Sequence, residues 1–254
     1  MLIDSHCHLD AAEFDDDRAE VMQRATAAGV EMIVVPAVAA RQFDGTARTV
    51  AAYAVCRAAY GIHPLYVGEA DPERDLARLE ARLADAGVVA VGEIGLDLYP
   101  GHPDPILQER LFAEQLRLAR RLDLPVLLHV RRAVDGVMKH LRRTEVPGGI
   151  AHAFNGSLQQ ARQLIARGFK LGFGGAMTFT GSRRIRALAA DLPLDAIVLE
   201  SDAPDMAPAW GQGTRNEPNN VARYASTLAE LRGISIEEVI AATGRNVLSC
   251  LPRC

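Results

Sequence analysis

The chain has 254 residues, of which 49% are hydrophobic and 24% charged, and its formal net charge is −4. This composition is typical of globular proteins. The negative net charge excludes a global electrostatic attraction to nucleic acid or to an anionic membrane surface, so any nuclease activity must depend on local charge and metal. The length suits one α/β barrel, and we expect a single domain over residues 1–254.

The first residues, the lengths of the apolar runs and the cysteines indicate in which compartment the protein works. The first residues, MLIDSH, lack the basic and long apolar regions of a secretory signal, and no apolar run is long enough for a transmembrane helix. The four cysteines, Cys7, Cys56, Cys250 and Cys254, show neither zinc-site spacing nor a disulfide framework. We therefore expect a cytoplasmic protein with reduced thiols and no membrane partner, for which a monomer is plausible.

Eight apolar runs alternate with amphipathic segments along the chain. The runs, typical of buried parallel strands, are 2–8, 31–38, 56–64, 88–97, 125–131, 148–154, 169–175 and 196–204. Helical patterns cover 15–28, 104–122, 157–167, 218–232 and 236–248. This alternation predicts a closed (β/α)8 TIM barrel. The alternative, an open doubly wound sheet, would carry a glycine-rich phosphate loop after its first strand, where this chain has His-Cys-His.

Seven residues with the side chains of metal ligands end or follow these strand candidates. They are His6, His8, His63, Glu93, His129, His152 and Asp202. Neutral imidazole and carboxylate are the usual ligands of catalytic divalent metals. Residues two apart on a strand face the same side, so we expect His6 and His8 to point together into the barrel mouth.

Six of these residues are too many for one tetrahedral ion and predict two divalent ions roughly 3.5–4 Å apart. The predicted ligands are His6, His8, Glu93, His129, His152 and Asp202. An unpaired carboxylate in the apolar strand around Glu93 would be costly. We interpret Glu93 as a bridge between the two ions, with an arginine partner as the alternative. The imidazoles favour zinc, manganese or iron over magnesium, and magnesium stays open.

Two further residues are predicted to contact the substrate. His63 precedes a proline at a strand end, and Arg131 follows His129 by two positions, so its guanidinium would face the site and clamp a phosphate oxygen. Arg132 is expected to face solvent. Glu200 is expected to lie deeper in the barrel with a structural role. Three later arginines follow the seventh strand candidate: Arg183, Arg184 and Arg186. We expect them to form a solvated helix face, with a phosphate-binding patch as the alternative.

The order of these motifs resembles the TatD family of metal-dependent hydrolases, often described as deoxyribonucleases. The matching stretches run from Ile3 to near the end of the chain: IDSHCHLD, AYGIHP, VGEIGLD, LPVLLHVRRA, HAFNGS, GGAMTF, LESDAPDM, RNEPNN and Asn246. The resemblance implies a TIM barrel of the amidohydrolase-like group. The chain departs from the pattern where HAFNG replaces the commoner HCFSG, which leaves open how Ala153 and Asn155 contact a substrate.

The resemblance also implies how the ligands divide between two metals. One ion would be held by His6, His8, Glu93 and Asp202, and the other by Glu93, His129 and His152. It further implies that Glu93 replaces the carbamylated lysine that bridges the metals in many barrel relatives.

The leading functional hypothesis is a metal-dependent phosphodiesterase that cleaves DNA from an exposed end. A hydroxide held between the metals would attack phosphorus, and Asp202 would orient it and accept its proton. One alternative is hydrolysis of a small amide, lactone or phosphoester by the same dinuclear centre. Another is a metal-binding quality-control partner with little turnover. A salt titration separates the first two, because binding through several phosphates weakens steeply with salt.

Overall fold

The computed structural model describes residues 1–254 and contains one eight-stranded sheet whose strands pair in chain order. All seven consecutive pairs are parallel. The strands are β1 (Leu2–Asp4), β2 (Val30–Pro36), β3 (Cys56–Tyr60), β4 (Val88–Asp97), β5 (Val126–Arg131), β6 (Gly149–Ala151), β7 (Phe169–Phe173) and β8 (Ile197–Leu199). Each overlaps one of the eight predicted apolar runs.

Hydrogen bonds just beyond β1 and β8 join the two ends of the sheet. Ser5 N donates to Leu199 O at 3.0 Å, and Asp202 N donates to His6 O at 2.8 Å. The buried Asp4 carboxylate accepts from Ser201 N at 2.8 Å, through Oδ1. The sheet is therefore closed, which confirms the predicted (β/α)8 TIM barrel and excludes the open doubly wound sheet.

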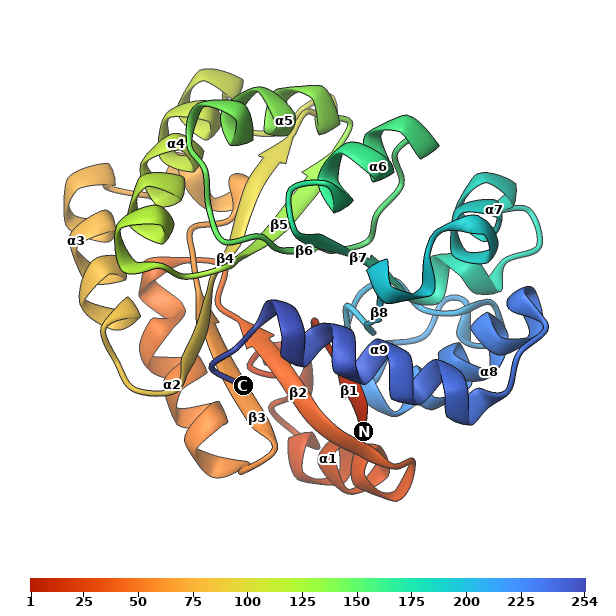
Figure 1. Cartoon of the computed structure of the whole chain (residues 1–254). Coiled ribbons are helices and arrows are strands. Elements are labelled where there is room, and N and C mark those ends of the chain that lie inside the picture. The colour runs from red at the N-terminus through yellow and green to blue at the C-terminus, as the bar shows by residue number, and fades with distance from the viewer.

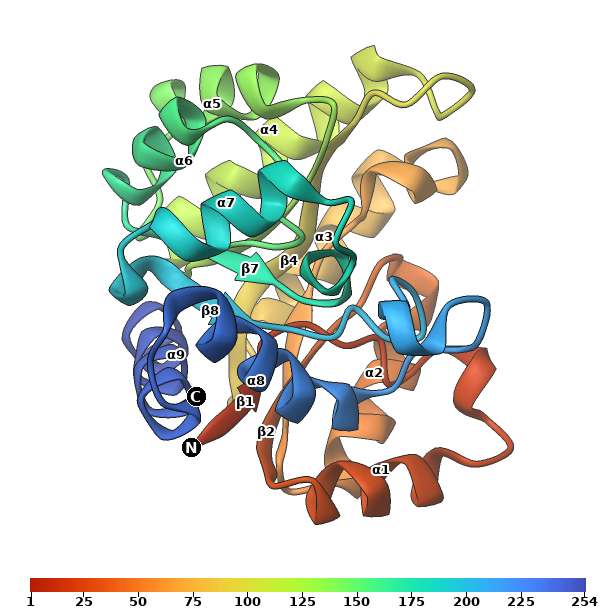
Figure 2. The same ribbon diagram turned by 90° about the vertical axis from the view of Figure 1, so that its right-hand side faces the viewer.

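Nine α-helices surround the strands (Figures 1 and 2). They are α1 (Arg18–Ala27), α2 (Phe43–Ala52), α3 (Pro72–Leu83), α4 (Pro105–Leu122), α5 (Val134–Arg143), α6 (Leu158–Ile165), α7 (Arg183–Asp191), α8 (Val221–Arg232) and α9 (Ile236–Cys250). Short polar side chains begin several of them. Asp104 accepts from Ile106 N, and Ser157 forms a capping box with Gln160. Such caps satisfy backbone N–H groups that have no partner inside the helix, and they explain why these helices begin where the sequence predicted.

The barrel interior is filled by apolar side chains, and α9 closes its amino-terminal end. Ile3, Val34 and Leu127 belong to a buried cluster inside the barrel, which Val247 and Leu251 join from α9 and the residue after it. Figure 1 shows α9 crossing the barrel beside both chain termini. Because this end is plugged, the carboxyl ends of the strands are the open face, where barrel enzymes carry their active sites.

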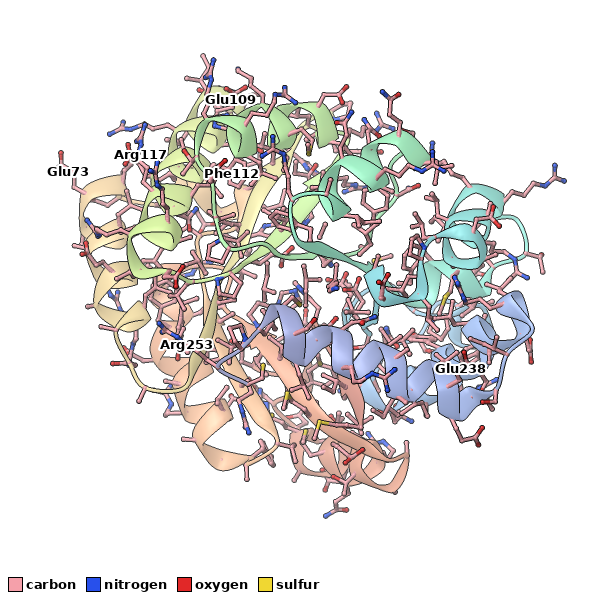
Figure 3. The ribbon with its side chains drawn as sticks, in the orientation of Figure 1. Glu73, Glu109, Phe112, Arg117, Glu238 and Arg253 are labelled. Carbon is pink, nitrogen blue, oxygen red and sulfur yellow. The ribbon has the colours of Figure 1, made fainter.

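The outer surface of the helices is charged. Glu73 and Arg117 point outward from α3 and α4, while Phe112 on α4 is buried beneath them (Figure 3). None of the helices has the length and apolar character needed to cross a bilayer.

Six strands, all except β4 and β5, end before the residue that the sequence predicted, and β1 and β8 are two of them. Strand β1 ends at Asp4 instead of residue 8, because Asp4 Oδ1 accepts from His6 N and bends the chain. Strand β8 ends at Leu199, and Asp202 has a left-handed backbone with φ of +56°. His6, His8 and Asp202 therefore lie on loops, and strand alternation is the wrong explanation for their shared direction.

Candidate metal centre

Glu93 lies at the middle of a group of histidines at the carboxyl ends of the strands. Its side chain is 2% exposed. Glu93 Oε2 is 3.2 Å from His6 Nε2 and 3.5 Å from His8 Nε2. On the other side, Oε1 is 2.9 Å from both His129 Nδ1 and His152 Nε2. Each carboxylate oxygen thus faces its own pair of imidazoles, which is the arrangement expected of a bridging ligand.

The first group of ligand atoms comprises Glu93 Oε2, His6 Nε2, His8 Nε2 and Asp202 Oδ1. The two imidazole nitrogens are 3.3 Å apart, and Asp202 Oδ1 is 3.7 Å from His6 Nε2 and 3.6 Å from His8 Nε2. Ligands bound at about 2.0–2.2 Å in a tetrahedral site lie roughly 3.3–3.6 Å from one another. His6, His8 and Glu93 therefore form one candidate set for a divalent ion, and Asp202 lies within 3.7 Å of both imidazoles of that set.

The second group comprises Glu93 Oε1, His129 Nδ1 and His152 Nε2, whose two nitrogens are 3.4 Å apart. Three protein ligands leave a coordination position for water or substrate, as catalytic zinc sites do. On its other side, His129 places Nε2 3.0 Å from Asp97 Oδ2. This partner makes Nε2 the protonated nitrogen and leaves the Nδ1 lone pair directed at Glu93 and His152.

Asp97 is a residue of the candidate site that the sequence analysis did not predict. It ends β4, is buried, and contacts His129 through one carboxylate oxygen. A signal for it was present, because Asp97 follows Glu93 by four positions in the same predicted strand. Even spacing on a strand indicates the same face.

The ring of His8 is oriented in the same manner as that of His129. His8 Nδ1 lies 3.2 Å from the carbonyl oxygen of Pro36, so Nδ1 carries the proton and donates it. The Nε2 lone pair is then free to bind a cation beside Glu93. In each group one imidazole, His8 in the first and His129 in the second, is thus oriented toward the candidate site by a hydrogen bond that the protein itself supplies.

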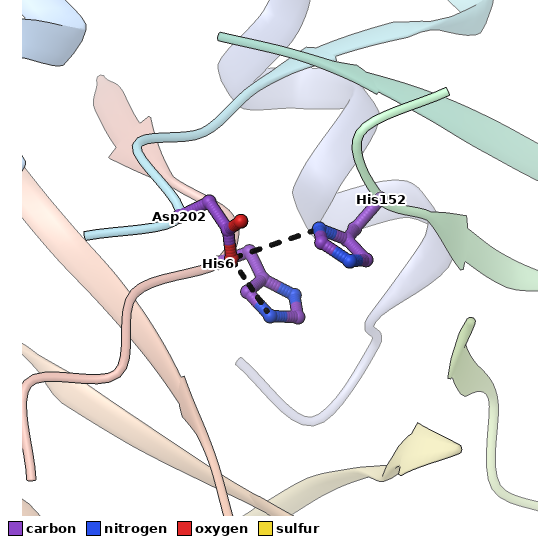
Figure 4. Close-up of side chains that lie close together, drawn as sticks. All are labelled: His6, His152 and Asp202. Atoms are coloured by element: carbon purple, nitrogen blue, oxygen red, sulfur yellow. Dashed lines mark ion pairs between the residues drawn. The ribbon is translucent and has the colours of Figure 1, made fainter. Parts of the chain in front are cut away.

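His152 lies between the two groups. Its Nδ1 is 3.8 Å from Asp202 Oδ1, and its ring stacks on that of His6 with centroids 4.1 Å apart (Figure 4). Nδ1 is also 3.7 Å from Glu200 Oε1. Glu200 in turn accepts from Ala153 N, and the absence of a side chain at Gly172 leaves room for its carboxylate.

His63 also reaches the centre, with Nε2 3.4 Å from Glu93 Oε1. By distance alone, it groups with Glu93 and His129 as a third set of candidate ligands. However, His63 Nδ1 accepts a hydrogen bond from Leu65 N at 3.1 Å, so a neutral ring carries its proton on Nε2. That nitrogen is a donor, which suits contact with a carboxylate or a phosphate oxygen better than metal binding.

Arg131 lies on the rim of the barrel, outside the ligand groups. Its side chain is 52% exposed, and Nη1 is 3.9 Å from Asp97 Oδ2. Its guanidinium carbon lies 4.2 Å from the centroid of the Tyr99 ring. Two of the three later arginines have partners, because Arg184 donates to Asn155 Oδ1 and Arg186 donates to Met177 O.

The buried position of the centre shifts the pKa values of its members. Burial lowers the pKa of His6 to about 3 and that of His63 to about 4. Burial raises the pKa of Asp202 to about 6, although His152 and His8 partly oppose the shift. Burial also raises the pKa of Glu93, but the surrounding histidines outweigh it and hold the value well below its usual range. An ionised carboxylate facing a neutral imidazole, as Glu93 faces His6, is a donor pair suited to a cation.

A cavity of about 90 Å³ adjoins Asp202 between the ends of β6, β7 and β8. Phe154, Phe173 and Met206 supply apolar walls. Ala153 and Asn155, the positions where the sequence departs from the common family wording, also line this cavity. The candidate metal centre therefore has space beside it, lined in part by Ala153 and Asn155.

Comparison with known proteins agrees with this geometry. A family model described as TatD related DNase matches residues 3–252. An uncharacterized metal-dependent hydrolase of Escherichia coli K12, YjjV, is 42% identical over 247 residues, which cover 96% of this chain and 95% of that protein. A protein named 3'-5' ssDNA/RNA exonuclease TatD, from Cronobacter sakazakii, is 36% identical over 242 residues. The match covers 91% of this chain and 90% of that protein.

The solved structures give the same relationship. The crystal structure of the Escherichia coli YjjV protein matches with a TM-score of 0.95 at 40% identity, covering 99% of this chain and 98% of the other. Sequence and fold thus agree over nearly the whole length. The chain belongs to the TatD related DNase family and is a metal-dependent hydrolase of that family.

Proposed function

We propose that the protein is a phosphodiesterase that uses two divalent metal ions to hydrolyse DNA, releasing nucleotides from an exposed single-stranded end. The observation that carries the proposal is the position of Glu93, whose two oxygens each face a separate pair of imidazoles at 2.9–3.5 Å. Two such groups sharing one carboxylate are the arrangement of two-metal phosphoryl-transfer centres.

The proposed ligands divide between the two groups. His6, His8, Glu93 and Asp202 would hold one ion, and Glu93, His129 and His152 would hold the other. Zinc, manganese and magnesium are the candidate metals. When bound, such ions lower the pKa of a coordinated water and stabilise the charge that builds on a phosphate.

The protein's own side chains would position and deprotonate the attacking water. Asp202 Oδ1 lies within 3.8 Å of His6, His8 and His152, so its carboxylate borders the space where the water must stand. We assign Asp202 as the group that orients this water and accepts its proton. His63, through the Nε2 proton, and Arg131, from the rim, would donate hydrogen bonds to phosphate oxygens.

Two observations support DNA as the substrate: the name of one relative in the family, and the arginines on the rim of the barrel. The Cronobacter sakazakii relative is named as an exonuclease for single-stranded DNA and RNA. The net charge of −4 gives no general attraction to nucleic acid, so arginines near the centre must supply it. We further propose that residues 1–254 act as one monomeric domain in a reducing cytoplasm, in keeping with four free cysteines.

A small phosphoester, amide or lactone is the second candidate substrate. The observation that favours it is the cavity of about 90 Å³ beside Asp202, whose apolar walls suit a compact organic group.

The test is hydrolysis by protein reconstituted separately with zinc, manganese and magnesium. Single- and double-stranded oligonucleotides labelled at either end are offered, with Asp202→Asn as the control. We expect progressive shortening of the single strand from one end, with little cleavage by the control. Intact oligonucleotides under every metal, together with hydrolysis of a small ester or amide, would replace the nuclease with the second candidate.

A further inference from the structure

Two consecutive arginines and one tyrosine form a cluster on the open rim of the barrel. Tyr99 follows β4 and is 41% exposed. The guanidinium carbon of Arg131 lies 4.2 Å from the Tyr99 ring centroid, and that of Arg132 lies 4.7 Å from it. We call these three residues the Tyr99 cluster. Guanidinium groups are attracted electrostatically to aromatic rings at such distances, so the ring orders both.

The backbone makes this convergence possible. Consecutive residues of an extended strand point to opposite sides, so Arg131 and Arg132 would not otherwise reach one ring. Arg131 is the last residue of β5, and Arg132 has a left-handed backbone with φ of +55°. This conformation is uncommon for a residue other than glycine. Strained backbone of this kind concentrates at functional sites, and here it turns a second cation onto the same ring.

The positive charge of the cluster is largely uncompensated. Arg131 has only Asp97 within ion-pair distance, at 3.9 Å, and Asp97 lies closer to His129. Arg132 is exposed and has no carboxylate within that distance. Arg215 elsewhere on the surface contrasts with this, since Asp17 accepts from both of its terminal nitrogens at 2.7 Å. The guanidinium group of Arg131 has one long ion pair and that of Arg132 has none, so both can accept an anionic partner without breaking a short ion pair.

The cluster is tied directly to the metal centre. Tyr99 N donates to Asp97 Oδ1 at 3.0 Å, and Asp97 Oδ2 lies 3.0 Å from His129 Nε2. His129 in turn lies 2.9 Å from Glu93. One carboxylate therefore connects Tyr99 with a proposed metal ligand, and Arg131 Nη1 lies 3.9 Å from the same carboxylate, so the cluster stands beside the candidate metal centre.

Building on the proposed function, we propose that the Tyr99 cluster binds the nucleotide next to the scissile phosphate of a single strand. The two guanidinium groups hold the phosphate of that nucleotide by charge-assisted hydrogen bonds. The ring and the guanidinium planes offer stacking surfaces to its base. Stacking tolerates any base, so this subsite binds single-stranded nucleic acid without sequence preference.

Steady-state kinetics of the metal-loaded enzyme tests the subsite with two substrates. One is a labelled single-stranded oligonucleotide, and the other is bis(4-nitrophenyl) phosphate, which has no neighbouring nucleotide. Tyr99→Ala and Arg132→Ala should each raise KM for the oligonucleotide about tenfold or more, since one stacking or phosphate contact is lost. Both variants should leave kcat/KM for the small diester within about twofold of wild type.

Two matched variants control for the ring and for the charge. Tyr99→Phe keeps the ring and should behave as wild type. Arg245→Ala removes one positive charge from α9 at the closed end of the barrel and should leave KM unchanged. Arg132→Ala, but not Arg245→Ala, should also flatten the dependence of log KM on log salt by about 0.7, the value for one phosphate of a single strand.

Two results would overturn the subsite. One is an unchanged oligonucleotide KM in both Tyr99→Ala and Arg132→Ala. The other is an equal loss on both substrates, which would mean that the cluster only supports Asp97 and His129. If wild type binds the oligonucleotide but does not cleave it, the proposed nuclease activity is wrong. The affinity of the same variants for the oligonucleotide, measured by fluorescence anisotropy, then tests the subsite by itself. If wild type neither binds nor cleaves it, both proposals fail.

Discussion

Asp97 Oδ2 lies 3.0 Å from Nε2 of His129, the ring whose other nitrogen faces Glu93. Burial raises the pKa of Asp97, but the hydrogen bond with His129 and its other partners outweigh this and lower it to about 2. Asp97 is therefore ionised at neutral pH and fixes both the tautomer and the orientation of the ring. Carboxylates that hold ligating histidines in this way are part of a metal site, although they never touch the ion.

We predict that Asp97→Asn weakens metal binding at the position held by His129 and His152. The amide cannot supply the negative charge that orients the ring, and loss of such a partner typically lowers metal affinity about 10–100-fold. Metal titration followed by elemental analysis measures the effect. Asp104→Asn, which keeps a good helix cap on α4, is the control. Equal affinities in both variants would remove Asp97 from the site.

Deleting both histidines of one group should remove one ion and spare the other. The double variant His129→Ala, His152→Ala is expected to bind about one metal per chain, because Glu93 Oε2, His6, His8 and Asp202 still surround the first position. Wild type is expected to bind about two. Elemental analysis after reconstitution and gel filtration counts them. Retention of two ions by the double variant would show that the second group was assigned wrongly.

Asp202→Asn should preserve the fold and the metals while removing most turnover. Asparagine matches the shape of the side chain and keeps one oxygen, but it cannot accept a proton from water at neutral pH. Loss of a general base typically lowers the rate about 10²–10⁴-fold. kcat, metal content and the melting temperature are measured together. Near-normal kcat with unchanged metal content would exclude Asp202 as the proton acceptor.

Bicarbonate should have no effect on activity. The bridging position is occupied by Glu93, whose carboxylate needs no carbon dioxide to become anionic. Reconstitution in buffer depleted of bicarbonate should therefore give the same specific activity as reconstitution in its presence. A reversible loss on depletion would indicate a carbamylated lysine and a different role for Glu93.

The apolar runs were sufficient to predict the barrel, because a parallel strand covered on both faces must be apolar along its whole length. They did not predict where β1 and β8 end. The bend at Asp4 depends on a side-chain hydrogen bond to His6 N, and the turn at Asp202 depends on a left-handed backbone. Neither feature changes the hydrophobic pattern, so the strands were predicted too long.

The candidate ligands were predictable because histidines and acids are unusual at the ends of apolar strands. The residues that contact these ligands were harder to predict. Asp97 was overlooked although it shares a strand face with Glu93. Arg132 and Tyr99 lie 33 positions apart on two loops. Their contact requires a left-handed backbone at Arg132, which the sequence does not predict. Strand alternation would have placed Arg132 on the opposite side from Arg131.

An ion-pair network anchors the loop that carries Asp202. Arg215, near the end of this loop, donates to both oxygens of Asp17 at 2.7 Å and to Glu217 Oε1 at 3.0 Å. Arg24 on α1 donates to Glu217 Oε2 at 2.7 Å. The network thus ties the loop after β8 to the start of α1. The hydrogen bond from Arg215 is the main reason that the pKa of Asp17 falls to about 2.

We predict that Asp17→Asn destabilises the protein at pH 7 and that its difference from wild type narrows in acid. A folded-state pKa below the ordinary 3.8 means that ionised Asp17 stabilises the fold above about pH 4, and this contribution is lost as pH falls toward 2. Urea unfolding at pH 7, 5, 4 and 3 measures the trend. Asp16→Asn is the matched control, because Asp16 is the exposed neighbour of Asp17 and makes no ion pair. Its free energy of unfolding should equal that of wild type at every pH. A gap that stays constant from pH 7 to pH 3, or one equal to that of the Asp16 variant, would show that the pair with Arg215 does not anchor the loop.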